Sequence, residues 1–153
     1  ADGAVGVLSS LSESISESAW SRLVCIVSDA DGGEGTIEAV KRGIPVILHA
    51  HGDNFDSWKD LLHTASKNSF PPRLVLTHQT PGEIDGMYNP GGFTDGDRAI
   101  CFLLALGVPI EKISLLGTRT DIVGKWSGVT KPAEKIIKLE WMAKVLDIIG
   151  IEY

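Results

Sequence analysis

The sequence is poor in cysteine, in positive charge and in long apolar runs. It contains only Cys25 and Cys101, each within an apolar stretch, so we expect buried reduced thiols rather than a disulfide framework. No apolar run approaches the length of a membrane span and no secretory signal peptide is visible, which favours a cytoplasmic protein without a membrane partner. The formal net charge of −6 disfavours nucleic acid as a partner.

Apolar strand-like and helix-like segments alternate along the 153 residues. Strands are predicted at 22–27, 45–48, 73–77 and 112–116, and helices at 4–19, 36–42, 55–66, 95–106 and 132–149. This order predicts one α/β domain over residues 1–153, with a mainly parallel sheet and helices on both faces. Residues 124–130 are expected to form a loop. The abrupt start of the chain leads us to expect that an N-terminal segment is missing.

Acidic and imidazole side chains follow two of the predicted strands. Asp29 and Asp31 come directly after the strand at 22–27, and the glycine pair that begins at Gly32 lets backbone approach a ligand. The carboxyl ends of parallel strands are where α/β sheets bind ligands. Carboxylates so placed suit Mg²⁺, which takes oxygen ligands and substrate phosphates. Asp53, after the strand at 45–48, is predicted to complete the acidic trio.

The stretch His49-Ala50-His51-Gly52-Asp53-Asn54 leaves several interpretations open. Alternate residues of an extended stretch point the same way, so His49, His51 and Asp53 are able to form a zinc-type site. In a second interpretation Asp53 holds Mg²⁺ and the imidazoles contact phosphate or substrate. In a third, one or both histidines are hydrogen-bonded structural groups. The neighbouring aspartates favour placing the metal on Asp29, Asp31 and Asp53, while His49, His51 and Asn54 shape the phosphate and acceptor pockets.

A glycine-rich loop, Gly91-Gly92-Phe93-Thr94-Asp95-Gly96-Asp97-Arg98, runs into the start of a predicted helix. Backbone amides at such a helix start bind phosphate, and Arg98 is a candidate phosphate clamp or a surface ion pair. One of Asp95 and Asp97 is expected to cap the helix. Among the lysines of the last helix, Lys138 is a candidate for reaching a triphosphate. We therefore predict that the three clusters meet, hold divalent metal and present a nucleoside triphosphate.

These motifs together resemble a known enzyme family. Asp2-Gly3-Ala4, Asp29-x-Asp31-Gly32, the His49–Asn54 stretch, Thr77-x-Gln79, the Gly91–Arg98 loop followed by Ala99, and Lys138-Leu139-x-Trp141 occur in one order. The chain thereby resembles archaeal-type 6-hydroxymethyl-7,8-dihydropterin pyrophosphokinases, which look like relatives of thiamin pyrophosphokinase in their catalytic domain. The resemblance implies a three-layer α/β sandwich that follows an N-terminal region. It also implies Mg²⁺- and ATP-dependent transfer of a pyrophosphoryl group to the pterin hydroxymethyl group, with release of AMP.

The resemblance and the residue chemistry together give a set of predicted roles. Catalytic roles are predicted for Asp53, Asp95 and Arg98, metal binding for Asp29, Asp31 and Asp53, and nucleotide or acceptor binding for Asp2, Gly32, His51, Asn54, Gln79, Gly91, Gly92, Thr94 and Lys138. Asp53 or Asp95 accepts the hydroxyl proton, and the sequence does not choose between them. The expected partners are the small-molecule substrates, and a homodimer is left open.

Three other functions stay open at this point. Thiamin pyrophosphokinase shares the chemistry but uses another acceptor. A metal-dependent phosphohydrolase would use His49, His51 and Asp53 without an acceptor. A non-catalytic nucleotide-binding module would bind ATP and release no AMP.

Overall fold

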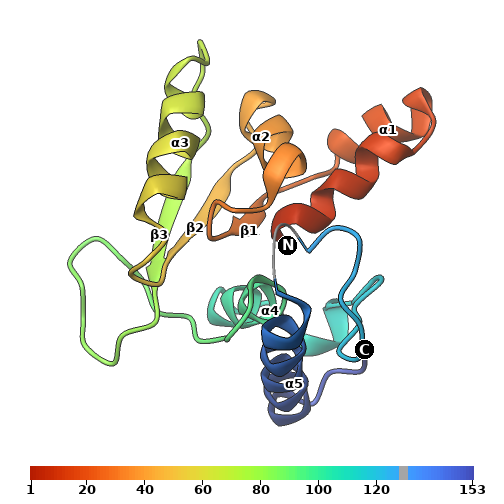
Figure 1. The fold of residues 1–153 in the computed structure, drawn as a ribbon, viewed down its shortest axis with the longest axis vertical. Coiled ribbons are helices and arrows are strands. Elements are labelled where there is room, and N and C mark those ends of the chain that lie inside the picture. The colour runs from red at the N-terminus through yellow and green to blue at the C-terminus, as the bar shows by residue number, and fades with distance from the viewer. Residues whose placement is uncertain (128–130) are drawn as a thin grey trace. The chain divides into compact units, whose positions relative to one another are not determined.

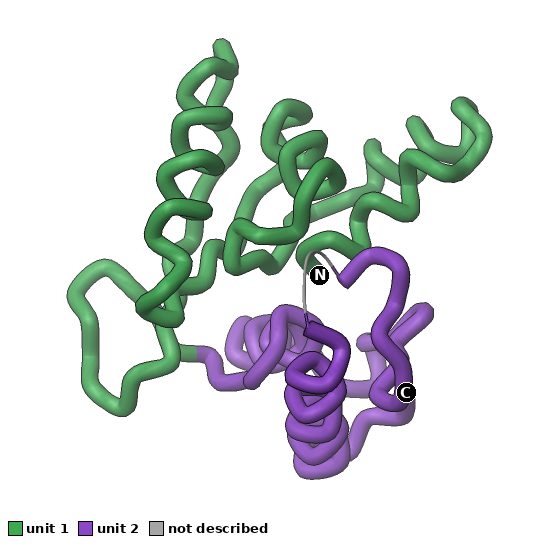
Figure 2. Tube along the Cα trace, viewed as in Figure 1, with its two compact units in different colours: residues 1–89 green, residues 90–153 purple. Residues whose placement is uncertain are grey.

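The computed structural model describes residues 1–127 and 131–153, so the predicted loop at 124–130 lies partly outside the described residues. Figure 1 shows the helices and strands along the chain. The chain forms two compact units, residues 1–89 and residues 90–153 (Figure 2), and each is described here by itself.

The first unit is built on a three-stranded parallel sheet. Strands β1 (Ile26–Ser28), β2 (Val46–Ala50) and β3 (Leu74–His78) lie in the order β1-β2-β3. Val46 pairs with Ile26 on one side and with Leu74 on the other. The three strands predicted in this part of the sequence are confirmed. The first is shorter than predicted, because Val24 is 81% exposed and lies outside the sheet.

Two helices connect the strands of this sheet. Helix α2 (Gly33–Lys41) joins β1 to β2, and α3 (Phe55–Ser66) joins β2 to β3. The two helices contact each other, as right-handed crossovers between successive neighbouring strands require (Figure 1). The buried core beneath them is made of Val5, Trp20, Ile26, Ala39, Val40, Val46, Leu48, Leu61 and Ala65. This arrangement turns the carboxyl ends of all three strands toward one edge.

The predicted helix at 4–19 is wrong as a single element. The chain instead forms a 3-10 helix, η1 (Asp2–Ser10), and then α1 (Glu13–Trp20). The close packing of η1 on α2 explains the difference, because a Cβ at Gly35 would lie only 2.5 Å from the backbone nitrogen of Gly6. Ile15, in the middle of the predicted helix, is 58% exposed.

The second unit is helical in the part that the structure describes. It contains α4 (Asp95–Ala105), the short 3-10 helix η2 (Ile110–Lys112) and α5 (Pro132–Ile149). The predicted strand at 112–116 is wrong. Ile113 and Leu115 pack against the apolar cluster of α4 and α5, which includes Ile100, Leu139, Met142 and Leu146. Alternating apolar residues are therefore partly buried against helices here, and no strand lies beside them among the described residues of this unit.

The fold class predicted from the sequence is confirmed at the level of an α/β chain with a parallel sheet. Within the described ranges, no helix is both long enough and apolar enough to span a membrane. Cys25 and Cys101 are half-buried free thiols, and burial raises the pKa of each thiol above its usual value.

Candidate functional site

The turn after β1 places two carboxylates at the edge of the sheet. Asp29 and Asp31 flank Ala30, whose φ of 77° lies in the left-handed region that a residue with a Cβ rarely adopts. The Ala30 amide donates to the hydroxyl of Ser28 over 2.9 Å, which helps to hold this turn. The backbone therefore curls between the two aspartates and directs both toward the same region.

A third carboxylate reaches this region from the start of the chain. The hydroxyl of Ser28 donates to the Asp2 carboxylate, and Thr36 Oγ1 donates to Asp2 Oδ1 over 3.2 Å. Gly32 is needed for this approach, because a Cβ there would lie 2.4 Å from Asp2 Oδ1. Ser28 and Thr36 were not among the predicted site residues. For Ser28, the only signal in the sequence was its position at the end of a predicted strand. Thr36 had no such signal.

The surroundings of Asp29 and Asp31 shift the pKa values of these two carboxyl groups in opposite directions. Partial loss of hydration, together with the nearby Asp29 and Asp2 carboxylates, raises the pKa of Asp31 to about 8. Burial acts to raise the pKa of Asp29 as well, but its hydrogen bond with Asp31 and the charge of His51 hold it below the usual value. The metal-free cluster therefore keeps a proton on Asp31 and a charge on Asp29.

Oxygen ligands gathered in this way fit a hard divalent cation. A cation among Asp2, Asp29 and Asp31 would replace the retained proton and offset the repulsion between the carboxylates. Such oxygen-rich sites suit Mg²⁺ better than the softer transition metals. The donor set therefore fits the metal implied by the resemblance, with Asp2 as an additional candidate ligand.

The turn after β2 separates its two histidines. His49 is 2% exposed, and its Nδ1 is 3.0 Å from the hydroxyl of Thr77 on β3. His51 lies at the edge, where its Nε2 is 3.2 Å from Asp29 Oδ2 and its Nδ1 is hydrogen-bonded to Asp53. This placement agrees with a structural His49 and a His51 that contacts the acidic cluster.

The remaining predicted residues of this unit have different surroundings. Asp53 has a side chain that is 86% exposed, and His51 lies between it and Asp29. Gln79 lies at the exposed end of β3, with its Oε1 3.5 Å from His49 Nε2. Asn54 is buried and hydrogen-bonded to backbone groups. The turn thus presents His51 and Asp53 to solvent and keeps His49 and Asn54 behind them.

The glycine-rich loop of the second unit folds over the start of α4. Asp97 is fully buried and accepts hydrogen bonds from the amides of Phe93 (2.6 Å) and Thr94 (2.7 Å). It therefore makes the helix cap that was expected of one of the two aspartates. Arg98 is 1% exposed, and its Nη1 donates to the Gly91 carbonyl over 3.0 Å. The meeting of this cluster with the two acidic clusters of the first unit stays a prediction.

Several further predicted residues also lie in this loop or in α5. Gly91 and Gly92 have φ values of 90° and 87°, and a Cβ at Gly92 would lie 2.5 Å from Arg98 Cα. The loop therefore needs glycine to turn back onto the helix. Asp95 begins α4 and is half-buried, and Lys138 is exposed on α5. The predicted roles of these residues, and of Thr94, in ligand binding stay predictions.

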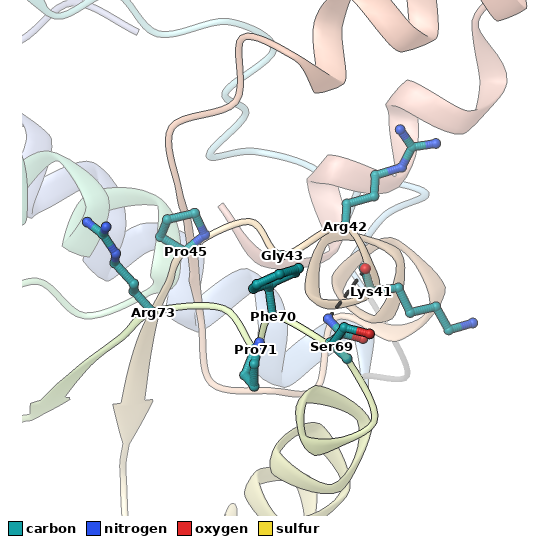
Figure 3. Close-up of a pocket in the computed structure, with 9 residues that line it drawn as sticks. Lys41, Arg42, Gly43, Pro45, Ser69, Phe70, Pro71 and Arg73 are labelled. Atoms are coloured by element: carbon teal, nitrogen blue, oxygen red, sulfur yellow. Dashed lines mark hydrogen bonds between the residues drawn. The ribbon is translucent and has the colours of Figure 1, made fainter.

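Two hollows in the first unit differ in what they offer a ligand. One of about 200 Å³ lies between α2 and α3, beside Asp31, and its walls combine apolar residues such as Val40 and Leu61 with polar ones. The other, of about 520 Å³, lies where β2 and β3 begin, at the edge away from the acidic cluster (Figure 3). There the charged ends of Lys41 and Arg73 point away from each other (Figure 3). The smaller hollow therefore adjoins the candidate site, and the larger one lacks converging polar groups.

Comparison with known proteins relates this site to named enzymes. A protein of Pyrococcus furiosus named 6-hydroxymethyl-7,8-dihydropterin pyrophosphokinase is 38% identical over 103 residues, which are 67% of this chain and 40% of that protein. The chain is similar to archaeal 6-hydroxymethyl-7,8-dihydropterin pyrophosphokinases. The resemblance inferred from the sequence motifs is confirmed.

Two further relatives carry the same name. The protein of Methanothermobacter thermautotrophicus is 33% identical over 131 residues, which are 80% of this chain and 53% of that protein. The protein of Methanocaldococcus jannaschii is 36% identical over 100 residues, which are 60% of this chain and 37% of that protein. The matched stretches thus span from 37% to 53% of the relatives' own length. No protein-family model and no solved structure matches the chain.

Proposed function

We propose that this chain is the catalytic part of a pyrophosphokinase that uses ATP and 6-hydroxymethyl-7,8-dihydropterin. The cluster of Asp2, Asp29 and Asp31 is the observation that carries this proposal, together with the similarity to three relatives of that name. We also propose that the complete catalytic domain is a three-layer sandwich of the thiamin pyrophosphokinase kind. The cytoplasmic location and the homodimer stay predictions.

In the proposed reaction the pterin hydroxymethyl oxygen forms a bond to the β-phosphorus of ATP. The bond from that phosphorus to the oxygen bridging the α- and β-phosphates breaks, and AMP leaves with the bonding electron pair. The hydroxyl proton passes to a carboxylate, for which Asp53 and Asp95 are both candidates. Transfers of this kind depend on positioning and on charge neutralisation more than on a covalent intermediate.

The residues of the first unit contribute to this reaction in separate ways. Asp29, Asp31 and Asp2 would hold Mg²⁺, and the bound ion would neutralise phosphate charge. His51 orients the Asp29 carboxylate on one side and Asp53 on the other. His49 stiffens the turn through its bond to Thr77. The nucleotide contacts predicted for Gly91, Gly92, Thr94, Arg98 and Lys138 are retained as part of the proposal.

The deciding experiment incubates the intact protein with ATP, Mg²⁺ and 6-hydroxymethyl-7,8-dihydropterin and measures AMP by chromatography. We expect AMP to form only when the acceptor is present, and the Asp29→Asn variant to lose this activity. The Asp121→Asn variant serves as the control, because Asp121 is an exposed residue that is paired with Arg119 and is not among the predicted site residues.

The same assay separates the other functions. AMP formation with thiamin and none with the pterin would indicate a thiamin pyrophosphokinase. Phosphate release without any acceptor would indicate a phosphohydrolase, and ATP binding without AMP would indicate a nucleotide-binding module. Any of these three results would contradict the proposal.

A further inference from the structure

Asn54 occupies the position before α3, yet its side chain does not cap that helix. Asparagine is among the preferred N-cap residues because its side-chain oxygen accepts a hydrogen bond from the first turn. Here no such bond forms, and the side chain, only 9% exposed, turns back toward the strands. The side-chain amide of Asn54 therefore makes its hydrogen bonds outside the helix.

The Asn54 amide binds three backbone groups from two segments, the end of β2 with its turn and the turn after β1. Its Nδ2 donates to the carbonyl of His49 over 2.7 Å and to the carbonyl of Asp29 over 2.8 Å. Its Oδ1 accepts a hydrogen bond from the amide of His51 over 3.2 Å. A side-chain amide has two N–H donors, so both are committed to backbone carbonyls and neither is available to a phosphate.

These hydrogen bonds connect β1 and β2 beyond their last pair of backbone partners. The pairing of β1 with β2 ends at Ser28 and Leu48, and the next residues along the two strands are Asp29 and His49. Asn54 connects the carbonyls of these two residues through its own Nδ2. It therefore fixes the separation between the ends of β1 and β2 at the point where the acidic residues begin.

The same bonds orient the side chains at the edge. Asn54 holds the Asp29 backbone directly, and it holds the His51 backbone whose ring contacts the Asp29 carboxylate at 3.2 Å. Asp29 is thus fixed both at its carbonyl and at its carboxylate, and His51 also carries the hydrogen bond to Asp53. Loss of the Asn54 amide would release all of these groups together.

We propose that Asn54 is a positioning residue that fixes the Asp29 carboxylate relative to the His51–Asp53 turn and touches no ligand. This inference rests on the metal site of the proposed function, and it replaces the predicted ligand contact of Asn54 with an indirect role. Groups that orient metal ligands in this way matter almost as much as the ligands, and their loss weakens metal binding about 10–100-fold.

The test compares Asn54→Ala with Asn68→Ala, which offers a matched control. Asn68 is half-buried, and its Nδ2 also donates to two carbonyls, those of Val40 (2.7 Å) and Lys41 (3.4 Å), at the opposite edge of the unit. Mn²⁺ replaces Mg²⁺ as the probe, and its affinity is measured by calorimetric titration of the intact protein without nucleotide. We expect both variants to lower the melting temperature, and only Asn54→Ala to weaken Mn²⁺ binding, by about tenfold or more.

Each outcome decides for or against the positioning role. Unchanged Mn²⁺ affinity in Asn54→Ala would overturn it, as would an equal loss in Asn68→Ala or an absence of Mn²⁺ binding by the unsubstituted protein. If Asn54→Ala does not fold, Asn54→Ser retains one donor, and its Mn²⁺ affinity must still fall for the inference to stand. Normal Mn²⁺ binding that depends on Asn54, in a protein that forms no AMP, would contradict the proposed function and leave this inference intact.

Discussion

His51 Nε2 lies 3.2 Å from Asp29 Oδ2, although the two residues are in turns that follow different strands. The other ring nitrogen of His51 is hydrogen-bonded to Asp53. One imidazole thus connects a carboxylate of the proposed metal cluster with an exposed carboxylate of the next turn, and it does so at the edge where parallel strands end.

Replacing His51 with alanine should reduce pyrophosphoryl transfer without unfolding the chain. The Asp29 carboxylate would lose a partner that orients it, and Asp53 would no longer be held, so we expect a loss of about 10–100-fold in AMP formation. The control is His63→Ala, since His63 is exposed on α3. Equal rates in the two variants would show that the His51 contacts have no part in the reaction.

Replacing Asp31 with asparagine should stabilise the metal-free protein at pH 8. The pKa of Asp31 is raised to about 8, so the folded chain holds a proton that the unfolded chain releases above roughly pH 4. The free energy of unfolding therefore falls as the pH rises from about 4 to 8. Because solvent screens this exposed side chain, we expect only about 1 kcal/mol of stabilisation in Asp31→Asn.

Thermal denaturation between pH 4 and pH 9, in the presence of a chelator, measures this effect. The unsubstituted chain should lose stability through that window, and Asp31→Asn should lose less. Asp85→Asn removes an exposed aspartate of the same unit and should leave the pH dependence as it is. A pH dependence in Asp31→Asn identical to that of the unsubstituted chain would contradict the carboxylate repulsion inferred here.

Alanine at Gly32 should destabilise the first unit. The added Cβ would lie 2.3 Å from Thr36 Oγ1 and 2.5 Å from the backbone nitrogen of Gly3, so η1 has to move away from α2. Overpacking of this kind costs about 1–3 kcal/mol. Gly82→Ala is the control, because nothing lies within 4 Å of its added Cβ. Chemical denaturation of both variants tests the prediction, and similar midpoints would show that η1 yields without cost.

Alanine at Asp97 should loosen the glycine-rich loop of the second unit. The amides of Phe93 and Thr94 would lose their acceptor inside a buried turn, which we expect to cost about 2 kcal/mol. Asp121→Ala removes an exposed carboxylate that is paired with Arg119 and should have almost no effect. Hydrogen exchange of residues 91–98 is the measurement, since faster exchange is expected there in Asp97→Ala alone.

Local patterns in the sequence were sufficient to predict the long elements. α3 (Phe55–Ser66) and α5 (Pro132–Ile149) begin and end where they were predicted, and β2 and β3 lie within two residues of the predicted strands. Apolar periodicity and the prolines and glycines at the ends carry this information locally. The position of Asp29 and Asp31 directly after a parallel strand was also predicted from the sequence, while their role in metal binding stays a prediction.

Only the tertiary structure decided which side chains meet and which are buried. The sequence left the roles of His49 and His51 open, but pairing with β3 buries His49 against Thr77 and leaves His51 beside Asp29. Likewise Ile113 and Leu115 had the pattern of a strand, and packing against α4 and α5 satisfied them instead. Periodicity in the sequence shows which face of a helix or strand is apolar. The residues that cover this face come from distant parts of the chain, so only the tertiary structure shows which residues they are.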